Sequence, residues 1–307
     1  MEDLQNTSLY TKKKDLICSL IGMRPDDKQL NSFIIRYNGI TLKLSTSNPQ
    51  LEGDLRNEFP SSWFLDLKSN YDSHIIFYPP EHFNLSADEF EQEHSSDCIT
   101  FSQGSFSCAI QRDFLAAQNE QHTLCIARPS LGDGFYNCMR WFLPKHMIHQ
   151  NQLILHSSCV VGRNGKAYFF LGQSGAGKTT ITSLSEERTI LGDDMNILQV
   201  GASNIALPGG VGGQHFENID YNRQWPVGGF FWIVQGANSS KSKLEKNQGM
   251  AKLLASMTNL FWNNSEKEIE LKALELSELA MQNISMWELE FPKNSSFWEL
   301  IDGSKGD

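Results

Sequence analysis

The chain has 307 residues, a formal net charge of −10, 40% hydrophobic residues and 20% charged residues. This composition indicates a folded globular protein with a sizeable core and excludes a disordered chain. The acidic balance argues against nucleic acid or an anionic membrane as a partner. No stretch reaches the ~18 uninterrupted apolar residues that a membrane-spanning helix needs.

The start of the chain and its cysteines indicate a compartment. Met1-Glu2-Asp3 is acidic, and no apolar core of a signal peptide follows it. The six cysteines are scattered without a C-x-x-C pair, which favours free thiols over disulfides or a zinc site. We therefore expect a cytoplasmic protein without a membrane partner.

Residues 1–145 show short strand-like runs separated by turn residues, which predicts a β-rich accessory domain. Asn38-Gly39 between two apolar runs predicts a hairpin over residues 32–45. No catalytic arrangement is recognisable in this part. The further elements expected are a helix over 51–59, strands over 63–67 and 74–78, a hairpin over 98–112, a strand over 122–127 and a helix over 135–149.

Residues 146–307 are expected to form a second domain, in which strands and helices alternate as in an α/β fold. Asn164-Gly165 joins apolar runs over 153–161 and 167–171, which predicts a hairpin. The remaining expected elements are a helix over 179–187, a strand over 188–191, strands over 195–200 and 204–207, a strand over 230–235, helices over 247–263 and 271–283, and a strand over 286–291.

A phosphate-binding loop of the pattern G-x-x-x-x-G-K-[ST] occupies residues 172–179, between an expected strand and an expected helix. Its glycines let backbone amides converge on phosphate oxygens. Lys178 is predicted to reach the β- and γ-phosphates of ATP, and Thr179 to offer its hydroxyl to Mg²⁺. The nucleotide-binding residues predicted are Gly172, Ser174, Gly175, Ala176, Gly177, Lys178, Thr179 and Thr180.

Only fourteen residues separate Lys178 from Asp193-Asp194, so one short helix is expected to link the loop to the strand before the acidic pair. Successive strand side chains face opposite ways, so the two carboxylates need not share a role. One can hold Mg²⁺ while the other faces the incoming nucleophile. His156 lies on the expected strand over 153–161, which pairs with the strand that leads into the loop, and there its imidazole can orient a carboxylate.

Together these residues resemble the catalytic domain of HPr kinase/phosphorylase and related P-loop kinases, whose nucleotide-binding core is shared with phosphoenolpyruvate carboxykinase. The resemblance implies a P-loop-containing mixed-sheet α/β core of the phosphoenolpyruvate carboxykinase type with a β-rich N-terminal domain. It also implies that His156 and Asp193 activate a hydroxyl nucleophile, and that Asp194 serves the metal with Thr179. The segments that carry it are Leu155-His156-Ser157-Ser158, Arg163-Asn164-Gly165-Lys166, residues 172–179 and Leu191-Gly192-Asp193-Asp194.

The chain departs from that family downstream of Asp194, where the Glu-x-Arg-Gly signature is absent from the sequence. A glycine-rich stretch over 208–213 stands there instead, which is a substrate-covering loop or an ordinary surface turn. His215, Glu217 and Arg223 follow it and are candidates to supply the missing charges.

The sequence therefore predicts an ATP- and Mg²⁺-dependent kinase that transfers the γ-phosphate to a hydroxyl of a protein, a peptide or a small molecule. This HPr kinase-like enzyme would bind ATP and an unidentified hydroxyl-bearing acceptor. The resemblance also implies a homo-oligomer. The alternative is a non-catalytic ATP-sensing binding module. A motor- or switch-type ATPase or GTPase fits poorly, and a carboxykinase ranks last because no carboxylate-binding site is found.

Overall fold

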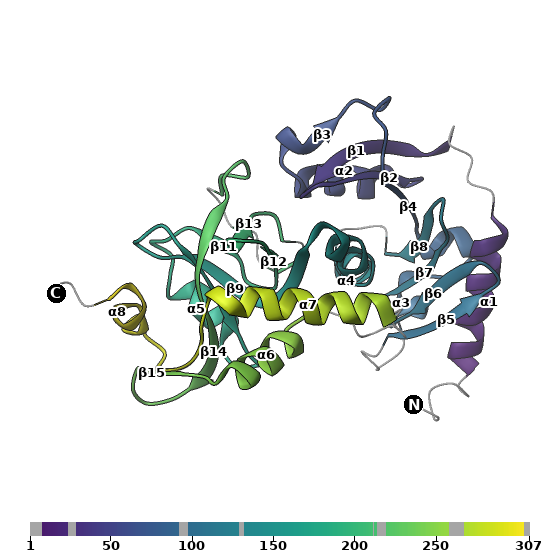
Figure 1. Ribbon diagram of the computed structural model, residues 1–307. Helices are drawn as coiled ribbons and strands as arrows, with labels where there is room; N and C mark the ends of the chain where they lie inside the picture. Colours follow the sequence, from purple (N-terminus) through teal and green to yellow (C-terminus); the bar gives the residue numbers. More distant parts are fainter. Residues whose placement is uncertain are drawn as a thin grey trace. The chain divides into compact units, whose positions relative to one another are not determined.

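The computed structural model describes residues 8–23, 29–91, 98–128, 132–210, 212–213, 219–257 and 267–303. The chain separates into two compact units, and the division falls between Phe142 and Leu143, inside a helix. Within the described ranges, every helix is too short or too polar to span a lipid bilayer. Figure 1 traces the chain through both units.

The first unit is built on an eight-stranded mixed sheet in the order β3-β1-β2-β4-β8-β7-β6-β5. The hairpin predicted over 32–45 is confirmed, and both Asn38 (φ 46°) and Gly39 (φ 95°) have the positive φ of its tight turn. Its strands are β1 Asn31–Tyr37, β2 Ile40–Thr46, β3 Phe64–Leu65, β4 Ser73–Tyr78, β5 Ile99–Gln103, β6 Phe106–Ile110, β7 Phe114–Gln118 and β8 Thr123–Ala127.

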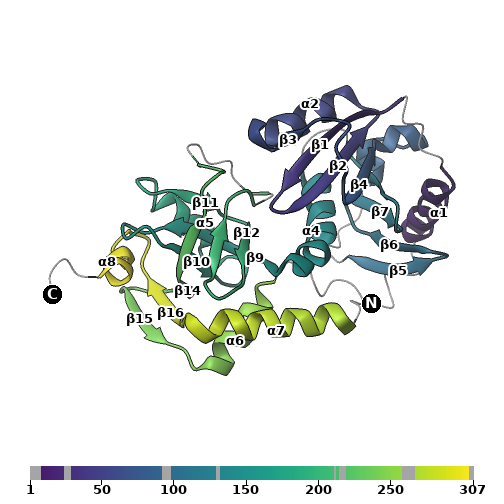
Figure 2. The same cartoon turned by 45° about the horizontal axis from the view of Figure 1, so that its top comes forward.

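Helices pack on this first sheet (Figure 2). Apolar residues of the first helix, such as Ile17 and Leu20, join Ile76 and Leu124 of the sheet in one core. On the last helix of the unit, the ring of Phe135 lies 5.5 Å from that of Phe77 on β4. The helices are α1 Ser8–Gly22, α2 Pro49–Glu58, α3 Ala87–Phe90 and α4 Asp133–Met147, with short 3₁₀ turns at Ser61–Trp63 and Pro80–Phe83. The end of α4 and the 3₁₀ turn Ile148–Gln150 after it already belong to the second unit.

The second unit also contains an eight-stranded mixed sheet, in which seven strands pair in the order β10-β9-β12-β13-β14-β16-β15 and the eighth, β11, pairs with β9. β14 also pairs with β10, so the pairings of β10, β9, β12, β13 and β14 close into a ring. The strands are β9 Gln152–Val161, β10 Ala167–Leu171, β11 Ile190–Gly192, β12 Met195–Gln199, β13 Ile205–Leu207, β14 Trp225–Gln235, β15 Ser240–Lys243 and β16 Met286–Phe291.

The central strands of the second sheet are buried on both faces, which explains why they are almost wholly apolar. On β10, Phe169 and Leu171 belong to the core shared with the longer helices, whereas Tyr168 and Phe170 belong to the core on the opposite face. Each such side chain contributes ~1.5–3 kcal/mol through burial. The helices are α5 Lys178–Ser183 and α8 Phe297–Asp302 on one face, and α6 Lys246–Ala255 and α7 Lys267–Asn283 on the other.

Several predicted bounds change in the structure. α5 ends at Ser183 rather than at residue 187, and β14 begins at Trp225 rather than at residue 230. Pro226 and the glycines of β14 disguise its first half, but a Cβ at Gly228 would lie 2.5 Å from the Tyr168 ring. That close approach requires glycine inside the strand. The helix predicted over 247–263 ends already at Ala255. The last part of that prediction, residues 258–263, lies outside the described residues.

Candidate functional site

The loop over residues 172–179 connects β10 to α5 in the second unit, in the strand–loop–helix order expected from the sequence. Gly175 (φ 77°) and Gly177 (φ 113°) adopt left-handed backbone conformations that favour glycine. A Cβ at Gly172 would lie 2.8 Å from the Cβ of Ala176, so the start of the loop also needs a glycine. The glycine spacing in the sequence thus has a steric cause.

The ammonium of Lys178 is held by the loop that carries it. Its Nζ donates to the carbonyl oxygens of Gly172 (2.9 Å) and Gln173 (3.2 Å), and the residue is only 7% exposed. Burial lowers the pKa of Lys178 from 10.5, because a low-dielectric environment disfavours the charged form. The loop therefore concentrates a cation at its centre, with carbonyl contacts that a stronger acceptor such as phosphate can replace.

Two consecutive residues of β9 tie the start of α5 to the acidic pair. The buried hydroxyl of Ser158 donates to the Lys178 carbonyl (2.5 Å), and the Ser157 N–H donates to the Asp194 carbonyl (2.9 Å). β10 and β11 both run antiparallel to β9, with Leu171 opposite Ser157 and Gly192 opposite Cys159. Both strands therefore end at the same edge, which brings the loop and Asp193-Asp194 to neighbouring positions.

The far side of the loop is braced by strands from later in the chain. Gln235, the last residue of β14, donates from Nε2 to the Gly175 carbonyl (2.9 Å). The ring of Phe291, at the end of β16, lies so close to Gly177 that a Cβ there would be 3.1 Å from it. These contacts restrict the loop from the side opposite Ser158.

His156 lies beside Asp194. Its Nε2 is 3.4 Å from Asp194 Oδ1, and the His156 and Asp194 side chains are 45% and 16% exposed. Met195, the residue after Asp194, is the cross-strand neighbour of His156, and this pairing brings His156 and Asp194 together. Asp193 is more deeply buried, at 7% exposure. The resemblance paired His156 with Asp193, whereas the interaction that the structure records is with Asp194.

The glycine-rich stretch lies against the acidic pair. A Cβ at Gly213 would be 2.1 Å from Asp193 Oδ1, and a Cβ at Gly210 would be 1.7 Å from the Met195 carbonyl oxygen. Arg223 lies over the Trp225 ring, with its guanidinium carbon 5.5 Å from the ring centroid. The other candidates in this region, His215 and Glu217, lie outside the described residues.

The remaining predicted residues lie in or next to the loop. Ser174 and Thr179 are exposed, and Ala176 and Thr180 are half-buried. Thr179 and Asp194 offer hydroxyl and carboxylate oxygens, which are hard ligands that suit Mg²⁺. Within the described part of the chain, no group of three or more His, Cys, Asp and Glu side chains gathers as a metal site. A cation here would draw its other ligands from phosphate and water.

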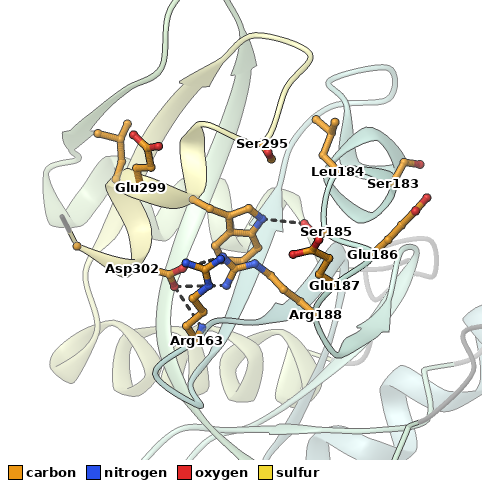
Figure 3. Close-up of a pocket in the computed structure, with 13 residues that line it drawn as sticks. Arg163, Ser183, Leu184, Ser185, Glu186, Glu187, Arg188, Ser295, Glu299 and Asp302 are labelled. Carbon is orange, nitrogen blue, oxygen red and sulfur yellow. Dashed lines mark hydrogen bonds and ion pairs between the residues drawn. The ribbon is translucent and has the colours of Figure 1, made fainter. Parts of the chain in front are cut away.

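A cavity of about 870 Å³ opens at the other end of α5, and the loop residues 172–179 do not line it (Figure 3). The Arg188 guanidinium stacks on the Trp298 ring at 3.7 Å and bonds to Asp302 at 2.7 Å. The Trp298 indole N–H donates to Ser185 Oγ at 2.9 Å. These contacts attach α8 to the segment that follows α5.

Sequence reasoning missed the residues that support the loop, namely Ser158, Gln235 and Phe291. Ser158 lies within one of the segments that carry the resemblance, but its partner is a backbone carbonyl twenty positions away. Gln235 and Phe291 are 60 and more residues from the loop. Strand pairing brings them together, and no local spacing signals that pairing.

The fold and the site define a mixed α/β protein with a phosphoenolpyruvate carboxykinase-like core. Residues 98–211 match the family model described as phosphoenolpyruvate carboxykinase, and this range includes His156, the loop and both aspartates. The expected carboxykinase-like core is therefore confirmed. The ATP and Mg²⁺ expected from the sequence agree with this family, which uses ATP and a divalent metal.

Individual relatives show the same likeness. Phosphoenolpyruvate carboxykinase (ATP) 1 of Arabidopsis thaliana is 26% identical over 162 residues, which are 49% of this chain and 23% of that protein. The enzyme of the same name from Urochloa panicoides is 29% identical over 149 residues, 48% of this chain and 21% of that protein. Phosphoenolpyruvate carboxykinase (ATP) of Candida glabrata is 44% identical over 62 residues, 20% of this chain and 11% of that protein. The chain thus spans less than a quarter of these relatives.

These findings correct the enzyme class expected from the sequence. The prediction of an HPr kinase-like phosphotransferase with a hydroxyl acceptor is wrong, because the matches point to the ATP-dependent carboxykinase family. The last rank that sequence analysis assigned to a carboxykinase is not supported by these matches. The forty residues over 155–194 that carried the resemblance lie within the range matched by the carboxykinase model, and a nucleotide-binding core does not determine which acceptor is used.

Proposed function

We propose that the second unit binds ATP with Mg²⁺ at the loop over 172–179 and Asp193-Asp194, and transfers a phosphoryl group between ATP and a small carboxylic acid. Phosphoenolpyruvate, which the names of the relatives contain, is the first such acid to test. One observation carries the proposal. Consecutive residues of β9, Ser157 and Ser158, bond to the backbones of Asp194 and Lys178, so the glycine-rich loop over 172–179 and a carboxylate pair adjoin.

Each residue has a defined task in this proposal. The loop amides and Lys178 bind and orient the phosphates, and the positive φ of Gly175 and Gly177 makes that cradle possible. Thr179 and Asp194 hold Mg²⁺, which, when bound, neutralises phosphate charge. His156 keeps Asp194 oriented through their 3.4 Å contact. Asp193, the more buried carboxylate, holds or moves a proton at its carboxylate oxygens.

The test is calorimetric titration of ATP with and without Mg²⁺, followed by an assay for ATP made from phosphoenolpyruvate and ADP, with and without bicarbonate. Lys178→Ala should weaken ATP binding by about 10–100-fold, because it removes a charged donor worth ~1.5–3 kcal/mol. The matched control is Lys166→Ala, which removes an exposed lysine from the β9–β10 turn. If Lys178→Ala leaves ATP binding intact, the loop over 172–179 is excluded as the ATP site.

The second candidate is a nucleotide-binding module that transfers nothing. It is favoured by the limited match, which covers residues 98–211 here and at most 23% of the relatives compared above. ATP binding that depends on Lys178, with no phosphoryl transfer to or from carboxylic acids, would decide for the module.

A further inference from the structure

Two glycines bring the segment after β13 into backbone contact with the acidic pair. Gly213 has φ +82°, and a Cβ built on it would lie 2.1 Å from Asp193 Oδ1 and 3.0 Å from the Asp194 Cβ. Gly210 touches the chain just beyond the pair, because a Cβ there would lie 1.7 Å from the Met195 carbonyl oxygen. The absence of side chains at both positions is what allows this approach.

We propose that Gly213 is a positioning residue, whose backbone sets the place of the Asp193 carboxylate. The inference rests on the proposed function, in which Asp193 handles a proton. Asp193 is 7% exposed, so protein atoms rather than water determine where its carboxylate lies. Gly213 is the described residue of the glycine-rich stretch that borders that carboxylate most directly.

The size of the effect follows from the distances. A Cβ atom almost never lies closer than 3.0 Å to another heavy atom. Asp193 Oδ1, at 2.1 Å from the Gly213 Cβ position, would therefore have to move by about 0.9 Å. Moving the segment instead is opposed at Gly210, whose Cα already packs against the Met195 carbonyl. A reacting group misplaced by about 1 Å can cost ~10²-fold in rate.

The same contact reaches Asp194. The Gly213 Cβ position is 3.0 Å from the Asp194 Cβ, and Asp194 Oδ1 is 3.4 Å from His156 Nε2. A side chain at position 213 therefore presses first on the Asp193 carboxylate and only then on the stem of Asp194. The three heavy atoms nearest to the Gly213 Cβ position all belong to Asp193 and Asp194, and none of them belongs to the loop over 172–179. ATP binding should accordingly suffer less than phosphoryl transfer.

The experiment compares Gly213→Ala with Gly165→Ala. Gly165, in the β9–β10 turn, has a similar φ of +75° but nothing within 4 Å of its Cβ position, so it carries the backbone cost alone. We expect Gly213→Ala to lower kcat by about 10–100-fold and to change the ATP Kd by less than about 3-fold. Gly165→Ala should leave both near the wild-type values.

A thermal double-mutant cycle with Asp193→Ala gives a readout independent of turnover, because that change removes the carboxylate that the new methyl group meets. Gly213→Ala should lower Tm by at least about 3 °C more than Gly165→Ala in the wild-type chain. In the Asp193→Ala background most of this difference should disappear, because only the 3.0 Å approach to the Asp194 Cβ remains. If Gly213→Ala alone does not fold, recovery of a folded protein by Asp193→Ala supports the inference.

The outcomes separate the two proposals. Failure of the wild-type protein to bind ATP would reject the proposed function. If the wild-type protein binds ATP, two results would overturn the role of Gly213. One is an equal loss of Tm from Gly213→Ala in both backgrounds, and the other is that Asp193→Ala does not rescue an unfolded Gly213→Ala chain. Unchanged kcat in Gly213→Ala, where the wild-type enzyme turns over, would overturn it as well.

Discussion

At the scale of single residues, Lys178 combines burial with a charge that the proposed function requires. Its Nζ is held by the carbonyls of Gly172 and Gln173, and burial lowers its pKa from 10.5. A lysine whose pKa is lower in the folded state than in the unfolded state destabilises the fold while it is charged. This cost disappears as pH rises through the window between the two values. A bound phosphate would repay that cost with charge-assisted hydrogen bonds.

The pH dependence of ATP binding follows from this shift. ATP should bind the protonated amine, so the Kd should rise as pH rises through the lowered pKa, and the rise should begin below pH 10.5. Titration calorimetry between pH 7 and 10.5, with circular dichroism to verify folding, measures it. Lys178→Arg, which stays charged above pH 12, should bind more weakly but with a flat profile. A wild-type profile as flat as that of the variant would contradict the role of Lys178.

At the scale of secondary-structure elements, short helices are held by side-chain contacts more than by their own hydrogen bonds. α8 has six residues, and the segment after α5 binds it through Arg188, which stacks on Trp298 and pairs with Asp302. The Arg188 and Asp302 side chains are 11% and 14% exposed, so solvent screens the pair only weakly. The indole N–H of Trp298 adds a bond to Ser185.

Arg188→Lys should destabilise the second unit by ~1–3 kcal/mol, because lysine keeps the charge but loses the planar stacking and one of the two hydrogen bonds. Chemical unfolding monitored by tryptophan fluorescence measures the change. Arg163→Lys is the control from the same cavity, since the backbone N–H of Arg163, rather than its guanidinium, bonds to Asp302. Equal losses from the two variants would argue against the stacked pair.

At the scale of the whole molecule, the chain consists of two units with separate sheets and separate hydrophobic cores. The loop, the acidic pair and the residues that support the loop, Ser158, Gln235 and Phe291, belong to the second unit. A ligand stabilises the state that it binds, by ~2.7 kcal/mol at a concentration of 100 times its Kd. That stabilisation should therefore be felt mainly in the unit that contains the site.

Hydrogen exchange with and without ATP and Mg²⁺ tests this expectation. Amides of β10, α5, β11 and β12 should exchange more slowly with the nucleotide, whereas those of β1 to β8 should change little, because ordering of the loop is transmitted through the second sheet. Lys178→Ala with the same additions is the control and should show no slowing. Equal slowing in both units would contradict a site confined to the second unit.

The elements that sequence analysis missed have identifiable causes. α1 carries Lys13 on its buried side, where Nζ donates to the carbonyls of Gln111 and Arg112, and this charge interrupts the apolar face. β15 is an exposed edge strand of alternating serine and lysine, and α8 is too short to show helical periodicity. β7 was also absent from the prediction, although its five residues are apolar or small apart from Gln118. Each would have needed its packing partner to be recognised.

The sequence by itself determined the features that depend on neighbours in the chain. These are the Asn-Gly turns, the strand–loop–helix around Lys178 and the short span to Asp193-Asp194, all of which local backbone conformation dictates. Only the tertiary structure decided which residues support the site, because Ser158, Gln235 and Gly213 reach it through strand pairing and close backbone contact across long separations. The order of residues encodes spacing, but distance in space is set by the folded core.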